Sequence, residues 1–229
     1  PERPRPLRTI PSDTATRGVA YSPDGTRLAF GQATGRVRIW ELTPRPHEVG
    51  RVRIGAGEVY TVAFGPDGDT LAAGVQDGEV RAWDVTTPAA PRRIALPQTT
   101  FRSWVNTTAF SPDGRYLVAG SSDAAVRVWR TRDWTVVGEL PHPAPLTQAV
   151  FARDGDVLVT AAADGATRLW DLRAALPALM NGRVFALTFS RDGRRLAGFT
   201  GEDTAVWDVV DPDRPRRIVH VTAPDPDAP

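Results

Sequence analysis

The stretch from His142 to Asp171 contains the side chains best suited to joint chemistry in this sequence: His142, Thr160, Asp164 and Trp170. An imidazole, a hydroxyl and a carboxylate are the three groups of a nucleophilic triad, in which the base takes the hydroxyl proton and the acid orients the base. The stretch has neither a nucleophile elbow nor an oxyanion-hole motif. A hydrolytic triad therefore has to be weighed against a structural role for the same residues.

Other kinds of site find little support. The chain has no cysteine, which excludes disulfides, thiolate metal sites and cysteine nucleophiles. The three histidines, His47, His142 and His220, are too far apart for a local metal motif. The Asp154-Gly-Asp156 segment lacks the alternating carboxylates and the final glutamate of a calcium loop. We therefore expect no metal and no cofactor, and we interpret the Asp-Gly pairs as turns.

Composition sets further bounds. The 229 residues are 41% hydrophobic and 24% charged, as in a globular protein with a core. The net charge of +1 argues against nucleic acid as a partner. No apolar run reaches the length of a membrane helix and no signal peptide is apparent, so we expect a cytoplasmic protein with no membrane partner. Because the first residue is Pro1 rather than Met, we expect an excerpt of a longer chain.

An internal repeat accounts for the elements around these residues. A turn tetrapeptide occurs five times, as Ser22–Gly25, Gly65–Gly68, Ser111–Gly114, Ala152–Gly155 and Ser190–Gly193. One tryptophan follows each turn, namely Trp40, Trp83, Trp129, Trp170 and Trp207. The interval from the turn aspartate to the tryptophan is 16 residues in the first four copies and 15 in the fifth. One supersecondary unit is therefore present five times.

Each copy reads as four short strands. An alternating run precedes the turn, as in 59–64, and an apolar run such as 71–74 follows it. A second tight turn leads to the strand that ends in tryptophan, and a fourth run closes the unit. Because one such sheet cannot bury both faces alone, the copies must stack around a centre. The predicted fold class is all-β, a β-propeller of four-stranded antiparallel blades.

Arginine recurs two residues before the tryptophan in four copies, at Arg38, Arg81, Arg127 and Arg168. A position that repeats is more often architectural than ligand-binding. We expect the aliphatic stems to pack between blades while the guanidinium groups contact carboxylates or water.

The repeats resemble the WD-40 repeat family. The naming dipeptide is present as Trp83-Asp84, Trp170-Asp171 and Trp207-Asp208, with near matches at Trp40-Glu41 and Trp129-Arg130. The resemblance covers about residues 14–221 and implies a propeller of about seven blades. We expect an open part of such a ring, with a closed five-bladed ring as the alternative.

The resemblance also implies a structural role for the histidine, threonine, aspartate and tryptophan of the 142–171 stretch. Family repeats carry a histidine nine residues before the last aromatic of the first strand, and only His142, nine before Phe151, fits. The fourth copy alone can then form the family's structural tetrad of His142, Thr160, Asp164 and Trp170. That tetrad is a buried hydrogen-bond chain from indole through hydroxyl and imidazole to carboxylate. We favour it over the hydrolytic triad, and we expect no enzyme.

The predicted boundaries follow the repeat. Residues 1–13 hold a strand left from a preceding blade, at Leu7 to Ile10, and residues 222–229 form a disordered tail. The blades between them are 14–55, 56–97, 98–141, 142–180 and 181–221. The fourth blade has the weakest closing run, Leu176 to Leu179.

Proteins of this family commonly bind partners on the top face, through the loops that precede each first strand. Aromatic and arginine side chains at these positions are typical of interaction surfaces. The candidate partner-binding residues are Trp104, Tyr60, Phe185, Arg17, Arg183, Glu58 and Asn106. Trp104 has no counterpart in the other copies, whereas Tyr60 and Phe185 have an alternative role in packing at the mouth of the central channel.

The expected function is a non-catalytic scaffold or sensor that binds a protein partner. All 28 basic residues are arginine, a composition that resembles proteins of GC-rich bacteria such as actinomycetes. In such bacteria the resemblance implies a larger signalling chain in which the propeller contacts an attached NTPase or Ser/Thr kinase module. The alternative is a propeller enzyme or small-ligand binder with its site in the central channel. That alternative needs a ring of carboxylates or histidines, and none appears in register.

Overall fold

The structure is a computed structural model that describes residues 9–97, 100–172, 177–181, 186–199, 203–210 and 216–222. Its regular elements are β-strands, which form five antiparallel sheets of four strands each. Within these ranges no helix is long and apolar enough to cross a membrane. The all-β prediction is confirmed.

The first two strands of every sheet flank the repeated turn tetrapeptide. The first strands are β1 (Thr16–Tyr21), β5 (Val59–Phe64), β9 (Val105–Phe110), β13 (Leu146–Phe151) and β17 (Ala186–Phe189). The second strands are β2 (Arg27–Gln32), β6 (Thr70–Val75), β10 (Tyr116–Ser121), β14 (Val157–Ala162) and β18 (Arg195–Phe199). The repeated turn in the sequence therefore corresponds to a repeated β-hairpin, formed by the first two strands of each sheet.

The third strand carries the repeated tryptophan, and the fourth closes the sheet. The third strands are β3 (Arg36–Glu41), β7 (Val80–Asp84), β11 (Ala125–Arg130), β15 (Ala166–Asp171) and β19 (Asp203–Asp208). The fourth strands are β4 (His47–Arg53), β8 (Arg92–Ile94), β12 (Thr135–Pro141), β16 (Pro177–Asn181) and β20 (Arg216–Thr222). Within each sheet, neighbouring strands are consecutive in the sequence, so every sheet is an up-and-down meander.

Local hydrogen bonds explain the constant spacing at the tetrapeptide turns. Asp24 accepts bonds from the Ser22 hydroxyl and from the Thr26 N–H, and the Ser22 bond is the main reason that the pKa of Asp24 falls to about 2. Gly25 has φ of 71°, in the left-handed region that glycine adopts without a steric cost. The turn therefore begins the second strand at a fixed residue and sets the register of the hairpin.

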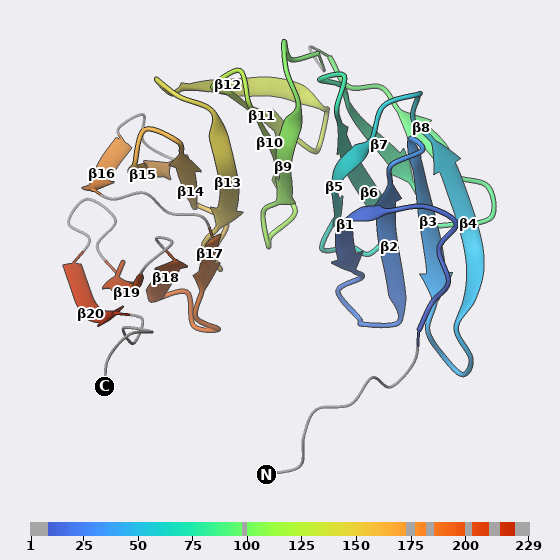
Figure 1. Ribbon diagram of the computed structural model, residues 1–229, viewed down its shortest axis with the longest axis horizontal. Helices are drawn as coiled ribbons and strands as arrows, with labels where there is room; N and C mark the ends of the chain where they lie inside the picture. Colours follow the sequence, from blue (N-terminus) through green and yellow to red (C-terminus); the bar gives the residue numbers. More distant parts are fainter. Residues whose placement is uncertain are drawn as a thin grey trace, which may run out of the picture.

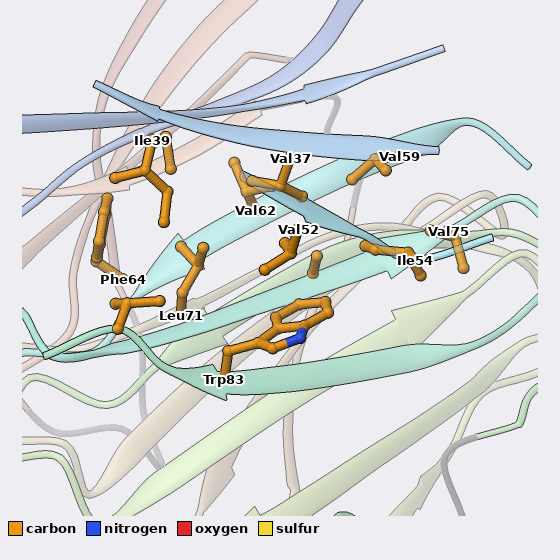
Figure 2. Packing of buried hydrophobic residues seen from close by; sticks show 13 residues of the cluster. Val37, Ile39, Val52, Ile54, Val59, Val62, Phe64, Leu71, Val75 and Trp83 are labelled. Atoms are coloured by element: carbon orange, nitrogen blue, oxygen red, sulfur yellow. The ribbon is translucent and has the colours of Figure 1, made fainter. Parts of the chain in front are cut away.

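The hydrophobic core lies between the sheets. Figure 2 shows the layer between the first and second sheets, where Val37 and Ile39 of β3 face Val62 and Phe64 of β5. Trp83 of β7 closes the layer at 5% exposure. Three further clusters occupy the following junctions. Because each core layer is shared by two sheets, a sheet is stable only beside a neighbour.

The five sheets follow one another along an arc (Figure 1). The first strands β1, β5, β9, β13 and β17 lie side by side in chain order on the inner side of this arc. The arc stays open between the last sheet (red) and the first sheet (blue) (Figure 1). We call the end of the sheets at which the first strands begin the top face, and the end with the tetrapeptide turns the bottom face.

The predicted end segments of the chain lie largely outside the described residues. Thr9 and Ile10 belong to no strand, but Leu7 and Arg8 lie outside the described residues, so the strand at Leu7 to Ile10 stays a prediction. The closing strand of the fourth sheet, β16, runs from Pro177 to Asn181. It begins one residue later and ends two residues later than the predicted run 176–179. Of the tail, Thr222 is the last residue of β20, and 223–229 lie outside the described residues.

Candidate functional site

Thr160 links the histidine and the tryptophan of the fourth sheet. The Trp170 indole N–H donates to Thr160 Oγ1 over 2.8 Å, and Thr160 Oγ1 lies 2.7 Å from His142 Nε2. His142 Nδ1 lies 2.9 Å from the Leu140 carbonyl, which can only accept, so Nδ1 carries the proton and Nε2 accepts from Thr160. Burial lowers the pKa of His142 and keeps this imidazole neutral.

Asp164 does not complete the chain as the tetrad predicts. Its carboxylate pairs with Arg168 and accepts the Ala166 N–H at 3.0 Å. Arg168 is also the main cause of the lowered pKa of Asp164. The Arg168 guanidinium, in strand β15, occupies the Asp164 carboxylate. The His142 imidazole donates to the Leu140 carbonyl instead. The predicted fourth link is therefore replaced by an ion pair.

The same geometry bears on the hydrolytic alternative. Thr160 is fully buried, and its hydroxyl both accepts from Trp170 and donates to His142. A nucleophile needs a free approach for its substrate and a base that can take its proton. Packed inside a sheet junction, this hydroxyl serves as a structural hydrogen-bonding group.

The repeated arginines of the third strands are paired with carboxylates. Arg38 binds Glu48, Arg81 binds Glu79, Arg127 binds Glu139 and Arg168 binds Asp164. The Arg127 guanidinium also lies 4.6 Å from the centre of the Phe101 ring. The prediction that these arginines are architectural is confirmed by their contacts.

An aromatic stack on the top face spans the second and third sheets. Tyr60 of β5 and Trp104, directly before β9, have ring centres 5.4 Å apart and planes 16° apart. The Trp104 side chain is 47% exposed, whereas the following residue, Val105, is fully buried. The buried valine and the Ser122 N–H bond to the Trp104 carbonyl hold the backbone beneath the exposed ring. A rigid, half-exposed aromatic pair results.

An ion pair continues this surface to the first sheet. Arg17 Nε donates to Glu58 Oε2 at 2.9 Å, and Nη2 lies 3.4 Å from Oε1. This hydrogen bond is the main cause of the raised pKa of Arg17. Exposed pairs of this kind add little to the stability of a fold, because water and salt screen the two charges. Both groups can therefore exchange their contact for one with a partner at little cost.

Asn106 extends the surface to the fourth sheet. Its Nδ2 donates to Ser122 Oγ at 2.8 Å and to the Leu146 carbonyl at 2.7 Å. We call the set of Arg17, Glu58, Tyr60, Trp104 and Asn106 the top-face cluster. Arg183 and Phe185, the other two predicted members, lie outside the described residues.

Sequence reasoning missed two supporting residues. Gln76 donates its N–H to the Glu58 carbonyl at 2.9 Å, and Ser122 bonds both Trp104 and Asn106. Both residues occupy the turn between the second and third strands. That turn lies at the top face in the four sheets in which it is described, so the register of the repeat was the signal that could have identified them.

A separate cavity lies at the bottom face between the second and third sheets. It has a volume of about 780 Å³ and is lined by two tetrapeptide turns together with Ile94, Phe110 and Trp134. Trp134 has φ of 56°, in the left-handed region. Within the described ranges no group of three or more histidine, aspartate or glutamate side chains is arranged to hold a metal ion.

Five stacked four-stranded meanders with their first strands along the inner side define a β-propeller. Four segments match the family described as WD domain, G-beta repeat, namely 4–41, 50–84, 96–130 and 134–171, and the chain belongs to this family. The fifth sheet lies beyond the matched segments, although it has the same four strands.

Known structures share this fold. A chain of "Crystal Structure of Mitotic Checkpoint Complex" superposes with a TM-score of 0.82 over 94% of this chain and 67% of that chain, at 19% sequence identity. At this identity the likeness shows the fold. Because 1706 solved chains match, the fold by itself does not select a function. The curated proteins contain no match.

Proposed function

We propose that this chain is a non-catalytic protein-interaction module whose docking surface is the top-face cluster. The observation that carries the proposal is the Tyr60–Trp104 stack, because a half-exposed tryptophan on a rigid support is the kind of anchor that dominates protein interfaces. Membership of a family whose propellers typically bind proteins supports the proposal. So does the similar chain, which was solved as part of a complex.

The top-face cluster combines the features of an interface centre and its rim. The aromatic pair offers apolar area with little conformational entropy to lose, since its rings are already stacked. The Arg17–Glu58 pair beside it offers one charge of each sign. A partner segment with an apolar side chain flanked by an acidic or basic group would match this arrangement.

We extend the proposal to the biological setting. The arginine-only basic composition suits a GC-rich bacterium, and the module would then belong to a larger signalling protein. In that setting the top-face cluster docks on an attached NTPase or Ser/Thr kinase module of the same chain. Release or formation of this contact would regulate the catalytic module.

The test replaces Trp104 with a photo-crosslinking phenylalanine analogue in cells that express the full-length protein. Val137, 46% exposed on the outer strand β12, is the matched control position. Crosslinks from position 104 that are absent from position 137 identify the partner. With the purified partner, Trp104→Ala should weaken binding by roughly thirtyfold, the effect of a hot-spot residue worth about 2 kcal/mol.

Trp104→Phe keeps a ring over Tyr60 and should retain most of the affinity. Equal crosslinking from both positions, or unchanged affinity of Trp104→Ala, would reject the top-face cluster as the docking surface.

A further inference from the structure

Arg27 fills the bottom of the junction between the first and second sheets. Its Nη2 donates to the Gly68 carbonyl at 2.8 Å, and its Nη1 donates to the Val85 carbonyl at 3.3 Å. The guanidinium lies 5.8 Å from the centre of the Phe64 ring and 3.5 Å from the Asp69 carboxylate. The second sheet therefore binds a guanidinium group through two carbonyls, one aromatic ring and one carboxylate.

The junction between the second and third sheets lacks this arginine. Thr70, the first residue of β6, occupies the position of Arg27, because each lies two residues after the glycine of its tetrapeptide turn. The residues that correspond to Gly68, Val85 and Phe64 in the third sheet are Gly114, Thr131 and Phe110. These residues and Thr70 line the bottom-face cavity of about 780 Å³. The shorter side chain therefore leaves open the space that an arginine occupies at the preceding junction.

The next two junctions differ at this position. The third has Tyr116, whose side chain packs against the core cluster of the third and fourth sheets. The fourth has Val157, and the described lining of its smaller cavity, about 400 Å³, contains two arginines, two aspartates and no aromatic residue. The second and third sheets each have a neighbour on both sides, so the larger cavity does not depend on where the sequence begins or ends.

The larger cavity is acidic. Its charged lining residues are Asp67, Asp69, Asp84, Asp113 and Arg132. Asp69 and Asp113 form ion pairs with arginines outside the lining, whereas Asp67 and Asp84 have no ion pair among the described residues. The Thr86 hydroxyl bond is the main cause of the lowered pKa of Asp84, so this carboxylate is ionised at neutral pH. Two carboxylates are therefore available to a cation.

The cavity suits a guanidinium better than a metal ion. Within the described ranges no three acidic or histidine side chains are arranged to hold a metal. Ile94, Phe110 and Trp134 give the cavity an apolar wall. A guanidinium stacks on aromatic rings and donates to several acceptors at once, whereas an ammonium group is compact and strongly hydrated.

Trp134 is held at this cavity by a network of side chains. Its φ of 56° is a left-handed conformation that bulky residues rarely adopt. Asp133 stabilises the loop by accepting the Thr135 N–H at 3.2 Å, the Thr135 hydroxyl at 2.7 Å and the Arg130 guanidinium at 2.7 Å. An unusual backbone conformation that its surroundings maintain is typical of binding sites.

One acceptor differs between the two junctions. The Thr131 hydroxyl donates to the Gly114 carbonyl, whereas Val85 has no hydroxyl to donate to Gly68. A carbonyl oxygen has two lone pairs, so the Gly114 carbonyl can accept one further bond.

We propose that this cavity binds an arginine side chain from an extended segment of a protein partner, with its guanidinium in the position that Arg27 has at the preceding junction. The Asp67 and Asp84 carboxylates supply the negative charge, and Phe110 and Trp134 supply the aromatic wall. A volume of about 780 Å³ also encloses residues next to the arginine, since pockets of this size hold drug-sized ligands. The site lies at the opposite end of the sheets from the top-face cluster.

The test labels the chain with fluorotryptophan, so that each of its seven tryptophans gives a fluorine NMR signal. The probe is the peptide acetyl-Gly-Ser-Arg-Ser-Gly-amide at millimolar concentration. The Trp134 signal, assigned with Trp134→Phe, should shift on titration, whereas the signal of Trp104 on the top face should not. A peptide with citrulline in place of arginine has the same shape without the charge and should cause no shift.

Charge removal tests the two carboxylates. The double variant Asp67→Asn and Asp84→Asn keeps an oxygen to accept the local N–H bonds. It should weaken peptide binding by roughly tenfold or more, because charge-assisted hydrogen bonds are lost. Asp154→Asn, the same change at the equivalent turn position of the fourth sheet, is the matched control and should leave the affinity unchanged.

Thr70→Arg supplies the missing side chain from within the protein. Its guanidinium should occupy the cavity as Arg27 does at the preceding junction, so the peptide should no longer shift the Trp134 signal. Thermal unfolding shows whether each variant is folded, and the citrulline comparison requires no substitution in the protein.

An unchanged Trp134 signal with the arginine peptide would overturn the proposal. So would equal shifts with the citrulline peptide, or unchanged affinity in the double aspartate variant. Acetylarginine amide should bind more weakly than the peptide, and equal binding would replace the protein partner with a small guanidinium compound. Trp104→Ala should leave peptide binding unchanged, so this site and the top-face cluster can fail independently.

Discussion

Thr160 and Thr167 are buried threonines of the same blade with opposite hydrogen-bonding states. Thr160 binds both Trp170 and His142, whereas Thr167 Oγ1 is buried and has no hydrogen-bond partner among the described residues. A buried hydroxyl stabilises a fold only when it is bonded, because it loses its water in either case. The pair therefore isolates the contribution of the hydrogen-bond chain from that of threonine packing.

Thr160→Val should lower the free energy of unfolding by about 2 kcal/mol, because it leaves the Trp170 N–H and His142 Nε2 as orphaned buried groups at about 1–3 kcal/mol. Thr167→Val removes an unpaired hydroxyl and should leave stability equal or higher. Urea denaturation of both variants gives the comparison. Equal losses in the two would show that Thr160 contributes packing alone.

The neutral state of His142 predicts a pH dependence. Burial lowers the pKa of His142 below the value of about 6.5 that the unfolded chain has, so around that pH the unfolded state binds more protons. The free energy of unfolding should be constant above about pH 7.5 and should fall as the pH drops through about 6.5. Denaturation midpoints between pH 7.5 and 5.5 measure the effect. His142→Gln should have a flatter profile, and an equal slope would assign the dependence to other groups.

At the residue scale, the sequence predicts which residues lie near one another better than it predicts which of them form hydrogen bonds. The spacing from the turn aspartate to the tryptophan brings Thr160 and Trp170 together, because that spacing sets the register of β14 and β15. The partner of Asp164 was predicted wrongly. The His142 imidazole and the Arg168 guanidinium are both candidate donors to this carboxylate, and the pairing with Arg168 depends on side-chain rotamers, which the repeat period does not encode.

At the scale of elements, the turn between the second and third strands has one unusual member among the four sheets in which this turn is described. Glycine holds the left-handed position at Gly35, Gly78 and Gly165, whereas the third sheet has Ala124 there with φ of 70°. A Cβ on Gly35 would lie 2.2 Å from the Gly55 carbonyl oxygen, so that turn requires glycine for space as well as for conformation.

Ala124→Gly should raise the free energy of unfolding by about 0.5–1 kcal/mol, because a left-handed conformation costs a residue with a Cβ about 1–2 kcal/mol and glycine loses part of that gain as unfolded-state entropy. Guanidinium denaturation measures the change. Ala125→Gly, one residue later in strand β11, is the control and should destabilise. A loss of stability in Ala124→Gly would mean that the methyl group packs usefully.

Element positions were largely predictable because the tetrapeptide turn fixes where two strands end and begin. Strand β16 was the exception. Its sequence lacks the alternation of the other fourth strands, and its register comes from pairing with β15, through Ala166 with Asn181 and Trp170 with Pro177. The bounds of β16 therefore depend on the sequence of β15 as well as on its own sequence.

At the scale of the whole molecule, stability should vary along the arc. The second, third and fourth sheets are covered on both sides, whereas the first and the fifth each have an exposed face. In repeat proteins the stability of a unit depends on its neighbours, so a unit with one junction opens more readily than a unit with two.

Hydrogen exchange measured by mass spectrometry at low protein concentration should show this gradient. We expect peptides of β10 to be protected longest and peptides of β18 to exchange faster. Equal protection of β10 and β18 at low concentration would indicate that a closed ring forms in solution.

The five copies were predictable from the sequence, since turn and tryptophan recur at constant spacing even where the fifth copy departs from the family pattern. The openness of the arc could be expected only by analogy. It depends on the angle between successive sheets, which is set by side-chain packing in layers such as that of Val62 and Trp83.

Every junction connects two unlike faces, so the arc has a polarity, and the residues that recognise a neighbour are encoded within each repeat. Duplication or loss of one whole repeat, about 40 residues in this family, therefore preserves every remaining junction. Removal of half a repeat destroys the junctions on both sides. Blade number is then a property that recombination in phase with the repeat can change in one step, without the evolution of any new interface.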